Sequence, residues 1–418
     1  MCSSGVLFPL MRRIHLLIVL CLATRITLAA QSPPGSKPRA RELGISALIG
    51  GTPGAFDAIT DVAGVEVGHT TLVSGDGPLI VGKGPVRTGV TVVHPRGRQS
   101  GDPVFAAWFT LNGNGEMTGT TWIDESGYLE GPVAITNTHS VGVVRDAILK
   151  WQVSRPGLQP WGLPVVAETY DGGLNDINGF HVRDEHVLQA LGGARGGAFA
   201  EGNVGGGTGM ICHQFKGGIG TASRLVDADA GGFAVGVLVQ CNYGGRPSFR
   251  VAGVPVGREI ADLLPCRIGD APNDRGVTRP CDSPGIGGEA ADPEQGSIIV
   301  VVATNAPLMP HQLKRLAKRV SLGIGRMGGS GANSSGDIFL AFSTANPQSA
   351  EAPDRTRVDL IANARMNALF DATVQATEEA ILNALLAADT MTGAGGLRVY
   401  ALPHDRLLNT LRKYNALK

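Results

Sequence analysis

From Ile45 onwards, short runs of β-branched and apolar residues alternate with glycine-rich turns. Runs of this length between turn residues are typical of β-strands. They occupy residues 62–67, 89–94, 133–137, 165–169 and 233–240. Helical spacing of apolar residues appears between and after these runs, at 143–153, 184–191, 313–324 and 372–388. The alternation predicts a fold that mixes helices and strands.

Glycine accounts for 60 of the 418 residues, about twice ordinary usage. The chain has no strict three-residue repeat, so the glycines indicate tight turns and close backbone approaches rather than collagen. The 36 basic residues balance the 36 acidic ones, and 43% of the chain is hydrophobic. This balance excludes a disordered tail and a basic nucleic-acid-binding protein. The length suggests two or three domains at roughly 150 residues each, and one large α/β domain is also compatible with it.

The first thirty residues have the features of a signal peptide. Arg12 and Arg13 precede an apolar stretch at 14–24, and small residues follow up to Ala30. The stretch is shorter than the roughly 20 residues that span a bilayer, although an uncleaved anchor is the alternative. We therefore expect residues 1–30 to be removed and the mature protein to be exported, either periplasmic or secreted. Residues 31–44 are expected to form a disordered mature N-terminus.

Four cysteines remain after the signal peptide: Cys212, Cys241, Cys266 and Cys281. No Cys-x-x-Cys pair occurs, so a zinc ribbon or a thioredoxin-like motif has no support. Cys266 and Cys281 bracket a segment rich in Gly, Pro, Asp and Arg. In an oxidising compartment we expect a disulfide that closes this loop, with two free thiols as the alternative.

Residues 265–296 form a polar stretch that is longer than the usual limit of about 12 to 15 residues for a loop in a compact domain. It ends at Gly296 and Ser297, where an apolar run at 298–303 begins. Such a run is typical of a strand buried on both faces. A flexible loop that delivers a serine to a buried strand is what a self-cleaving N-terminal nucleophile enzyme requires. An ordinary loop-to-strand boundary is the alternative.

The chemistry of self-cleavage suits this pair of residues. The Ser297 hydroxyl can attack the carbonyl of Gly296, and glycine tolerates the strained backbone that this attack requires. Cleavage frees the α-amino group of Ser297. Because an α-amine has a pKa of roughly 7.7 to 8.0, it can act near neutral pH as the general base for its own hydroxyl.

Seven polar or glycine-rich motifs accompany this junction. In chain order they are Glu-Thr-Tyr-Asp-Gly (168–172), Asn-Asp-Ile-Asn-Gly (175–179), 201–210, 216–224, Val-Gln-Cys-Asn-Tyr-Gly (239–244), Ala-Thr-Asn-Ala-Pro-Leu (303–308) and Ser-Ser-Gly-Asp-Ile-Phe (334–339). In this order they resemble the self-processing serine aminopeptidases of the L-aminopeptidase/D-esterase and β-peptidyl aminopeptidase family. The resemblance extends from Ile45 to the C-terminus. It implies a four-layer α/β/β/α sandwich.

The resemblance also implies how the chain is processed. One catalytic domain would consist of an α chain, residues 45–296 with 265–296 as the processing loop, and a β chain, residues 297–418. Members remove the N-terminal residue from short peptides, amino acid amides or esters with a free amino terminus, and some accept D- or β-residues. They usually assemble as tetramers of processed protomers. No metal-binding motif such as His-Glu-x-x-His appears, and no cofactor is expected.

Residue by residue, the resemblance assigns Ser297 as the nucleophile. Tyr170 and Asn242 would polarise the carbonyl and hold the oxyanion, for which a phenol and an amide are suitable donors. Ser335 and Asp337 would orient the nucleophile and relay protons. Residue 337 is Asp where some relatives have Glu, and the shorter side chain puts its reach to Ser335 in doubt.

The substrate contacts are assigned in the same way. Glu168 would bind the substrate ammonium, and Trp161 would form an aromatic wall of the pocket. A buried carboxylate of this kind excludes blocked peptides, because they would leave it unpaired. Asp171 and Asp176 lie close in sequence and are alternatives to Glu168.

Other interpretations compete with this one. Ser335 is a second candidate nucleophile, since it also precedes an apolar strand-like run. The chain lacks the Gly-x-Ser-x-Gly elbow that would indicate a Ser-His-Asp hydrolase. Its glycines at 205–209 lack the pattern of a phosphate-binding loop. An inactive exported protein that binds peptides or amines is a further alternative. A same-fold acyltransferase is another, although the related ornithine acetyltransferases use threonine as the nucleophile.

Overall fold

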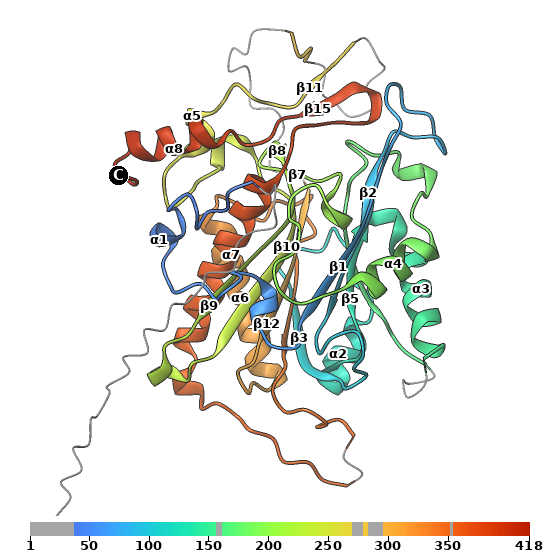
Figure 1. Cartoon of the computed structure of the whole chain (residues 1–418), viewed down its shortest axis with the longest axis vertical. Helices are drawn as coiled ribbons and strands as arrows, with labels where there is room; N and C mark the ends of the chain where they lie inside the picture. Colours follow the sequence, from blue (N-terminus) through green and yellow to red (C-terminus); the bar gives the residue numbers. More distant parts are fainter. Residues whose placement is uncertain (1–36, 156–160, 270–278, 283–295, 352–353) are drawn as a thin grey trace, which may run out of the picture.

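The computed structural model describes residues 37–155, 161–269, 279–282, 296–351 and 354–418. Two β-sheets face each other, and two helices cover the outer face of each sheet (Figure 1). Three apolar cores lie between the successive layers. The expected four-layer α/β/β/α sandwich is therefore confirmed.

The larger sheet has the strand order β4-β3-β13-β12-β10-β9, and its only parallel neighbours among the described residues are β12 and β13. Its strands are β3 (Val104–Thr110), β4 (Tyr128–Leu129), β9 (Gly218–Leu225), β10 (Ala234–Asn242), β12 (Ser297–Thr304) and β13 (Ile338–Ser343). The helices on its outer face are α6 (Pro310–Arg326) and α7 (Asn367–Ala387).

The smaller sheet has the order β1-β2-β5-β6. Its strands are β1 (Glu66–Ser74), β2 (Val86–His94), β5 (Val133–Asn137) and β6 (Val165–Thr169). Helices α3 (Val141–Val153) and α4 (Asp184–Gly193) cover it. The shorter elements are α1 (Ser46–Ile49), α2 (Thr120–Ser126), α5 (Val256–Glu259), α8 (His404–Lys413), β7 (Ile211–Cys212), β8 (Phe215–Lys216), β11 (Cys266–Arg267), β14 (Met391–Thr392) and β15 (Leu397–Val399).

Strand β12 is buried on both faces, as the apolar run at 298–303 predicts. Ile298, Val300 and Val302 pack toward α6 and α7. Ile299, Val301 and Ala303 pack between the two sheets. Because successive strand side chains point to opposite faces, Ser297 shares its face with Ile299 and points toward the smaller sheet.

The strand expected at 62–67 begins late, because β1 starts only at Glu66. A short 3-10 turn at Ile59–Asp61 precedes it. The Asp61 carboxylate accepts hydrogen bonds from the backbone N–H groups of Phe56 and Ala58, at 3.0 Å each. These local bonds hold the backbone in turns, so β-branched residues at 62–65 do not extend.

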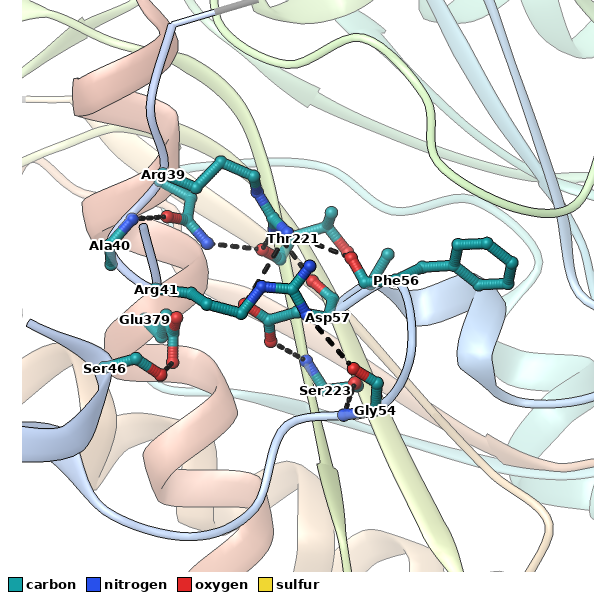
Figure 2. Close-up of polar contacts among 12 residues, drawn as sticks. Arg39, Ala40, Arg41, Ser46, Gly54, Phe56, Asp57, Thr221, Ser223 and Glu379 are labelled. Carbon is teal, nitrogen blue, oxygen red and sulfur yellow. Dashed lines mark hydrogen bonds and ion pairs between the residues drawn. The ribbon is translucent and has the colours of Figure 1, made fainter. Parts of the chain in front are cut away.

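The N-terminal segment is more ordered than its composition predicts. Residues 31–36 lie outside the described residues, but 37–44 dock onto the fold instead of being disordered. The Ala40 side chain is buried, and its backbone N–H donates to the Asn383 side chain of α7. Arg39 is also buried, and together with Asp57, Glu201, Arg224 and Glu379 it forms what we call the buried charge cluster. Figure 2 shows Arg39, Asp57 and Glu379 of this cluster. Ion pairs with distant residues hold the segment, and its composition does not reveal them.

Two disulfides lie among the residues that the structure describes. Cys266 and Cys281 are bonded, with their Cα atoms 4.9 Å apart. Cys212 and Cys241 form a second bridge, which the sequence analysis did not predict. Residues 1–30, where a signal peptide is expected, lie outside the described residues. Within the part of the chain that is described, no helix has the length and apolar character needed to cross a membrane.

Candidate active site

The ends of several strands meet at one edge of the sandwich. Ser297 is the first residue of β12, and its pairing partner is Asn242, the last residue of β10. Because β13 runs parallel to β12, the residues before β13 lie at the same edge as Ser297. The facing sheet contributes the C-terminal end of β6, which contains Glu168.

The Ser297 hydroxyl is held by the backbone of the loop before β13. Ser297 is only 5% exposed, and its Oγ accepts a hydrogen bond of 3.0 Å from the Gly336 N–H. A Cβ on Gly336 would lie 2.5 Å from the carbonyl oxygen of Asn114 and 2.6 Å from the Cα of Gly115. Only glycine therefore fits where this loop passes between β12 and the 112–115 segment.

The Asp337 carboxylate joins the nucleophile strand to Ser335. Its Oδ1 accepts hydrogen bonds from the Ile298 N–H at 3.1 Å and from the Ser335 hydroxyl at 2.6 Å. Asp337 and Ser335 are both fully buried. The aspartate therefore reaches Ser335 directly, despite its shorter side chain.

Asn112 is a site residue that the sequence analysis missed. Its Nδ2 donates to Asp337 Oδ2 at 2.9 Å, and its Oδ1 accepts from the Asp337 N–H at 2.6 Å. The Asn112 side chain thus binds both the carboxylate and the backbone of Asp337. The signal that could have revealed it is the Asn-Gly-Asn-Gly sequence at 112–115, directly after the apolar run that becomes β3.

The Asn242 carboxamide has a defined orientation. Its Oδ1 accepts from the Ile211 N–H at 2.8 Å, and its Nδ2 donates to the Tyr170 carbonyl at 3.1 Å. A carboxamide nitrogen carries two N–H groups, so the bond to Tyr170 uses one of them. The Tyr170 side chain is 46% exposed. The bond between these two predicted residues therefore runs through the Tyr170 backbone.

Gly296 packs directly onto Asn242. Its φ is +93°, a conformation that favours glycine. A Cβ at this position would lie 1.9 Å from the Asn242 carbonyl oxygen and 3.2 Å from its Nδ2. The Gly296 residue thus lies beside the Asn242 carboxamide. A donor at this position could stabilise negative charge on the Gly296 carbonyl oxygen.

Glu168 lies close to the loop before β13, whose Gly336 N–H binds Ser297. Its Oε1 accepts from the Glu116 N–H at 3.1 Å, and its Oε2 accepts from the Thr138 hydroxyl, a second contact that the sequence analysis missed. A Cβ on Gly115 would lie 3.3 Å from Glu168 Oε1 and 2.9 Å from the Gly336 Cα. Burial raises the pKa of the Glu168 carboxyl above its ordinary value.

The two alternative carboxylates are engaged elsewhere. Asp171 accepts a hydrogen bond from the Asn175 side chain at 3.0 Å, within the loop that follows β6. Asp176 pairs with His181 at 2.9 Å and accepts from the Gly82 N–H at 2.8 Å. These bonds organise loops, whereas Glu168 lies beside Gly115, which packs against Gly336 in the loop before β13.

Trp161 is not brought to these residues. It precedes the N-terminal end of β6, whereas Glu168 and Tyr170 lie at and beyond its C-terminal end. Its half-exposed ring packs edge-on against Trp122, with the ring centroids 6.1 Å apart. Because the intervening strand is extended, the predicted aromatic wall lies toward the opposite end of β6 within this chain.

The arrangement suits covalent acyl transfer through a serine. A buried hydroxyl at a strand end lies near a backbone N–H, an oriented carboxamide and a Ser-Asp pair, while a separate carboxylate lies across from it. Among the residues that the structure describes, no group of three or more His, Cys, Asp or Glu side chains could hold a metal ion.

Comparison with known proteins links this geometry to a family. The protein-family model described as Peptidase family S58 matches residues 57–399, a range that contains all the site residues above. The chain is 55% identical over 394 residues to the Beta-peptidyl aminopeptidase BapA of Sphingosinicella microcystinivorans, covering 93% of this chain and 96% of that protein.

Solved structures agree with this match. A Burkholderia sp. beta-aminopeptidase has a TM-score of 0.77 at 49% identity, covering 90% of this chain and 99% of that one. The L-aminopeptidase D-Ala-esterase/amidase of Ochrobactrum anthropi, described as a prototype for the serine aminopeptidases and a variant of the Ntn hydrolase fold, has a TM-score of 0.79 at 44% identity. That match covers 91% of this chain and 100% of the other.

Proposed function

Because the chain belongs to peptidase family S58, we propose that it is an exported aminopeptidase that cleaves itself between Gly296 and Ser297. Its general class, that of a serine aminopeptidase with the Ntn hydrolase fold, follows from the family and its relatives. In our proposal it removes the N-terminal residue, β-residues included, from short peptides, amides or esters. The observation that carries the proposal is the position of Ser297 at the start of β12, beside Gly336, Asn242 and the Asp337 carboxylate.

The proposed self-cleavage begins when Ser297 Oγ attacks the Gly296 carbonyl carbon. The tetrahedral intermediate places negative charge on the Gly296 oxygen, and the second N–H of the Asn242 side chain would stabilise it. The hydroxyl proton passes to the Ser297 nitrogen as the C–N bond breaks, which leaves an ester between Gly296 and the Ser297 side chain and frees the Ser297 α-amine. Water then hydrolyses the ester, which releases Gly296 as the C-terminus of the α chain.

In the proposed turnover, the new α-amine takes the proton from its own hydroxyl as Oγ attacks the substrate carbonyl. The proton then passes to the leaving amine, and an acyl-enzyme remains until water hydrolyses it. The hydrogen bond between Ser335 and Asp337 supports a role for this pair in orienting the nucleophile and relaying protons. Asn242 and the Tyr170 phenol would polarise the substrate carbonyl.

We assign the substrate ammonium to Glu168. Burial disfavours the charged form of this carboxyl, and a bound ammonium would compensate the charge. A blocked N-terminus offers no such compensation, so acetylated substrates should react poorly. The 55% identity to a protein named as a beta-peptidyl aminopeptidase supports the inclusion of β-residues.

Export and assembly are proposed on other grounds. The basic and apolar pattern of residues 1–30 supports export to the periplasm or beyond. The family resemblance supports a tetramer of processed protomers. Size-exclusion chromatography with light scattering on the mature protein would measure the assembly directly.

N-terminal sequencing of the purified chains tests the central step. We expect one chain that begins at Ser297, and a single uncut chain in the Ser297→Ala variant. Two normal chains from that variant would exclude Ser297, and a chain that begins at Ser335 would identify the rival nucleophile. Release of p-nitroaniline from β-alanyl and L-alanyl anilides, with N-acetylated anilides as controls, tests the activity. Correctly cut protein without turnover of any unblocked anilide would indicate a binding protein instead.

A further inference from the structure

Lys216 is a fully buried lysine behind the candidate site. Its Nζ donates to the backbone carbonyls of Gly217 at 2.7 Å, Met210 at 2.8 Å and Gly207 at 3.3 Å. An ammonium has three N–H groups, so these bonds use all of them. Burial lowers the pKa of Lys216 from its ordinary value, whereas the hydrogen bonds to three carbonyls favour the charged ammonium. An apolar side chain would fill this space without the cost of burying a charge.

One of these carbonyls leads directly to Asn242. The Met210 carbonyl belongs to the same peptide group as the Ile211 N–H, and that N–H donates to Asn242 Oδ1 at 2.8 Å. The Gly217 N–H donates to the same carbonyl at 2.9 Å, so the peptide is held from two directions. Hydrogen bonds in such a chain polarise one another. The ammonium therefore strengthens the bond that orients the Asn242 carboxamide.

The neighbouring covalent structure limits what else could hold this peptide. The disulfide between Cys212 and Cys241 joins the residue after Ile211 to the residue before Asn242. It fixes the distance between the two segments, but it does not determine which end of the carboxamide faces Gly296. The Ile211 N–H at Oδ1 and the Tyr170 carbonyl at Nδ2 together decide that orientation. A rotated carboxamide would lose both bonds and would present its oxygen to the developing charge.

We infer that Lys216 is a positioning residue, which holds the Met210–Ile211 peptide so that Asn242 presents its amide nitrogen to the carbonyl under attack. The inference rests on the proposed function, in which Asn242 holds the oxyanion. Loss of one oxyanion donor costs about 10²- to 10³-fold in rate. We therefore expect Lys216→Met to lower kcat by at least ~10-fold. KM should change little, because Glu168 and its partners are not part of this chain of contacts.

A double-mutant cycle on the full chain tests the link. The variants are Lys216→Met, Asn242→Ala and the two combined, assayed on an unblocked aminoacyl p-nitroanilide. If Lys216 acts through Asn242, the double variant should have the kcat of Asn242→Ala alone. Where a variant is processed slowly, the rate at which the chain beginning at Ser297 appears replaces kcat, since self-cleavage uses the same oxyanion donor.

Two further variants separate positioning from stability. Arg246→Met removes another buried cation, one that donates to the carbonyls of His213, Gln214, Ile260 and Leu263. It should lower thermal stability while kcat per processed molecule stays within about threefold, because its bonds do not include the Met210–Ile211 peptide. Lys216→Gln keeps two N–H donors, and should recover part of the lost kcat. It replaces Lys216→Met in the cycle if that variant does not fold.

The outcomes separate the inference from the function beneath it. If Asn242→Ala is impaired and the two losses in kcat multiply in the double variant, the positioning role of Lys216 is overturned, while the oxyanion assignment of Asn242 stands. Normal kcat and normal processing in Asn242→Ala would overturn the oxyanion assignment, and the inference with it. An equal loss of kcat in Arg246→Met would reduce Lys216 to a general contributor to stability.

Discussion

The buried charge cluster holds three carboxylates and two guanidinium groups, so one negative charge is in excess. Arg39 Nε lies 2.7 Å from Glu201, and Arg224 lies 2.5 Å from Glu379. Each arginine also lies 3.6 Å from Asp57, which both of them contact. Burial, together with the nearby Glu379 carboxylate, raises the pKa of Asp57 from 3.8 to about 8. We therefore expect the cluster to hold a proton, centred on Asp57, at neutral pH.

This proton makes the stability of the fold depend on pH. Between pH 3.8 and about 8, Asp57 binds a proton in the folded state but not in the unfolded state. The contribution to stability is therefore largest at low pH and is lost as the pH rises toward 8. Each pH unit corresponds to about 1.4 kcal/mol. From pH 6 to pH 9, the loss from this one group should be about 2 to 3 kcal/mol.

Asp57→Asn should remove this dependence, because the amide is neutral at every pH. Its carbonyl oxygen can still accept the 3.0 Å hydrogen bond from the Ser223 N–H. Relative to the unmodified protein, the variant should gain about 2 to 3 kcal/mol of unfolding free energy between pH 6 and pH 9. Urea unfolding of the processed protein, followed by tryptophan fluorescence at both pH values, measures this difference.

Ser223→Ala is the matched control. It removes the bond from the Ser223 hydroxyl to Asp61, 2.6 Å long, without removing a titratable group. Its loss of stability should be equal at pH 6 and pH 9. For each variant, the change in unfolding free energy from the unmodified protein is compared between pH 6 and pH 9. If this change is independent of pH for Asp57→Asn, as it should be for Ser223→Ala, Asp57 does not hold the proton.

The remaining predictions concern the site and the loop before it. Glu168→Gln should raise KM for unblocked anilides about tenfold or more, because the amide cannot neutralise an ammonium; an unchanged KM, with a normal thermal melt, would remove Glu168 from substrate binding. Ser335→Ala should lower kcat by at least about 100-fold while circular dichroism stays unchanged, since the hydroxyl that bonds Asp337 is lost; near-normal kinetics would exclude it from the mechanism. Cys281→Ser opens the loop closed across a sequence separation of 15 and should cost about 3 kcal/mol in urea unfolding, and an unchanged midpoint would show that this loop does not contribute to stability.

The sequence by itself determined the features that local patterns encode. The runs at 133–137 and 165–169 coincide with β5 and β6, and the buried run at 298–303 lies within β12. Side-chain alternation and glycine turns depend only on near neighbours, so they can be interpreted without knowing the fold. Motif order led to the family and to the sandwich, which the structure and the comparisons confirm.

Only the tertiary structure decided which distant residues meet. Asn112 and Asp337 are 225 residues apart, and they bond because β3 and β13 are neighbours in one sheet. Arg39 lies in a segment that looks disordered in sequence, yet it is held by carboxylates from three other parts of the chain. The family resemblance placed Trp161 at the substrate pocket, but this residue lies toward the far end of β6. Strand register and sheet packing set these distances, and neither can be derived from the composition of a segment or from its spacing along the chain.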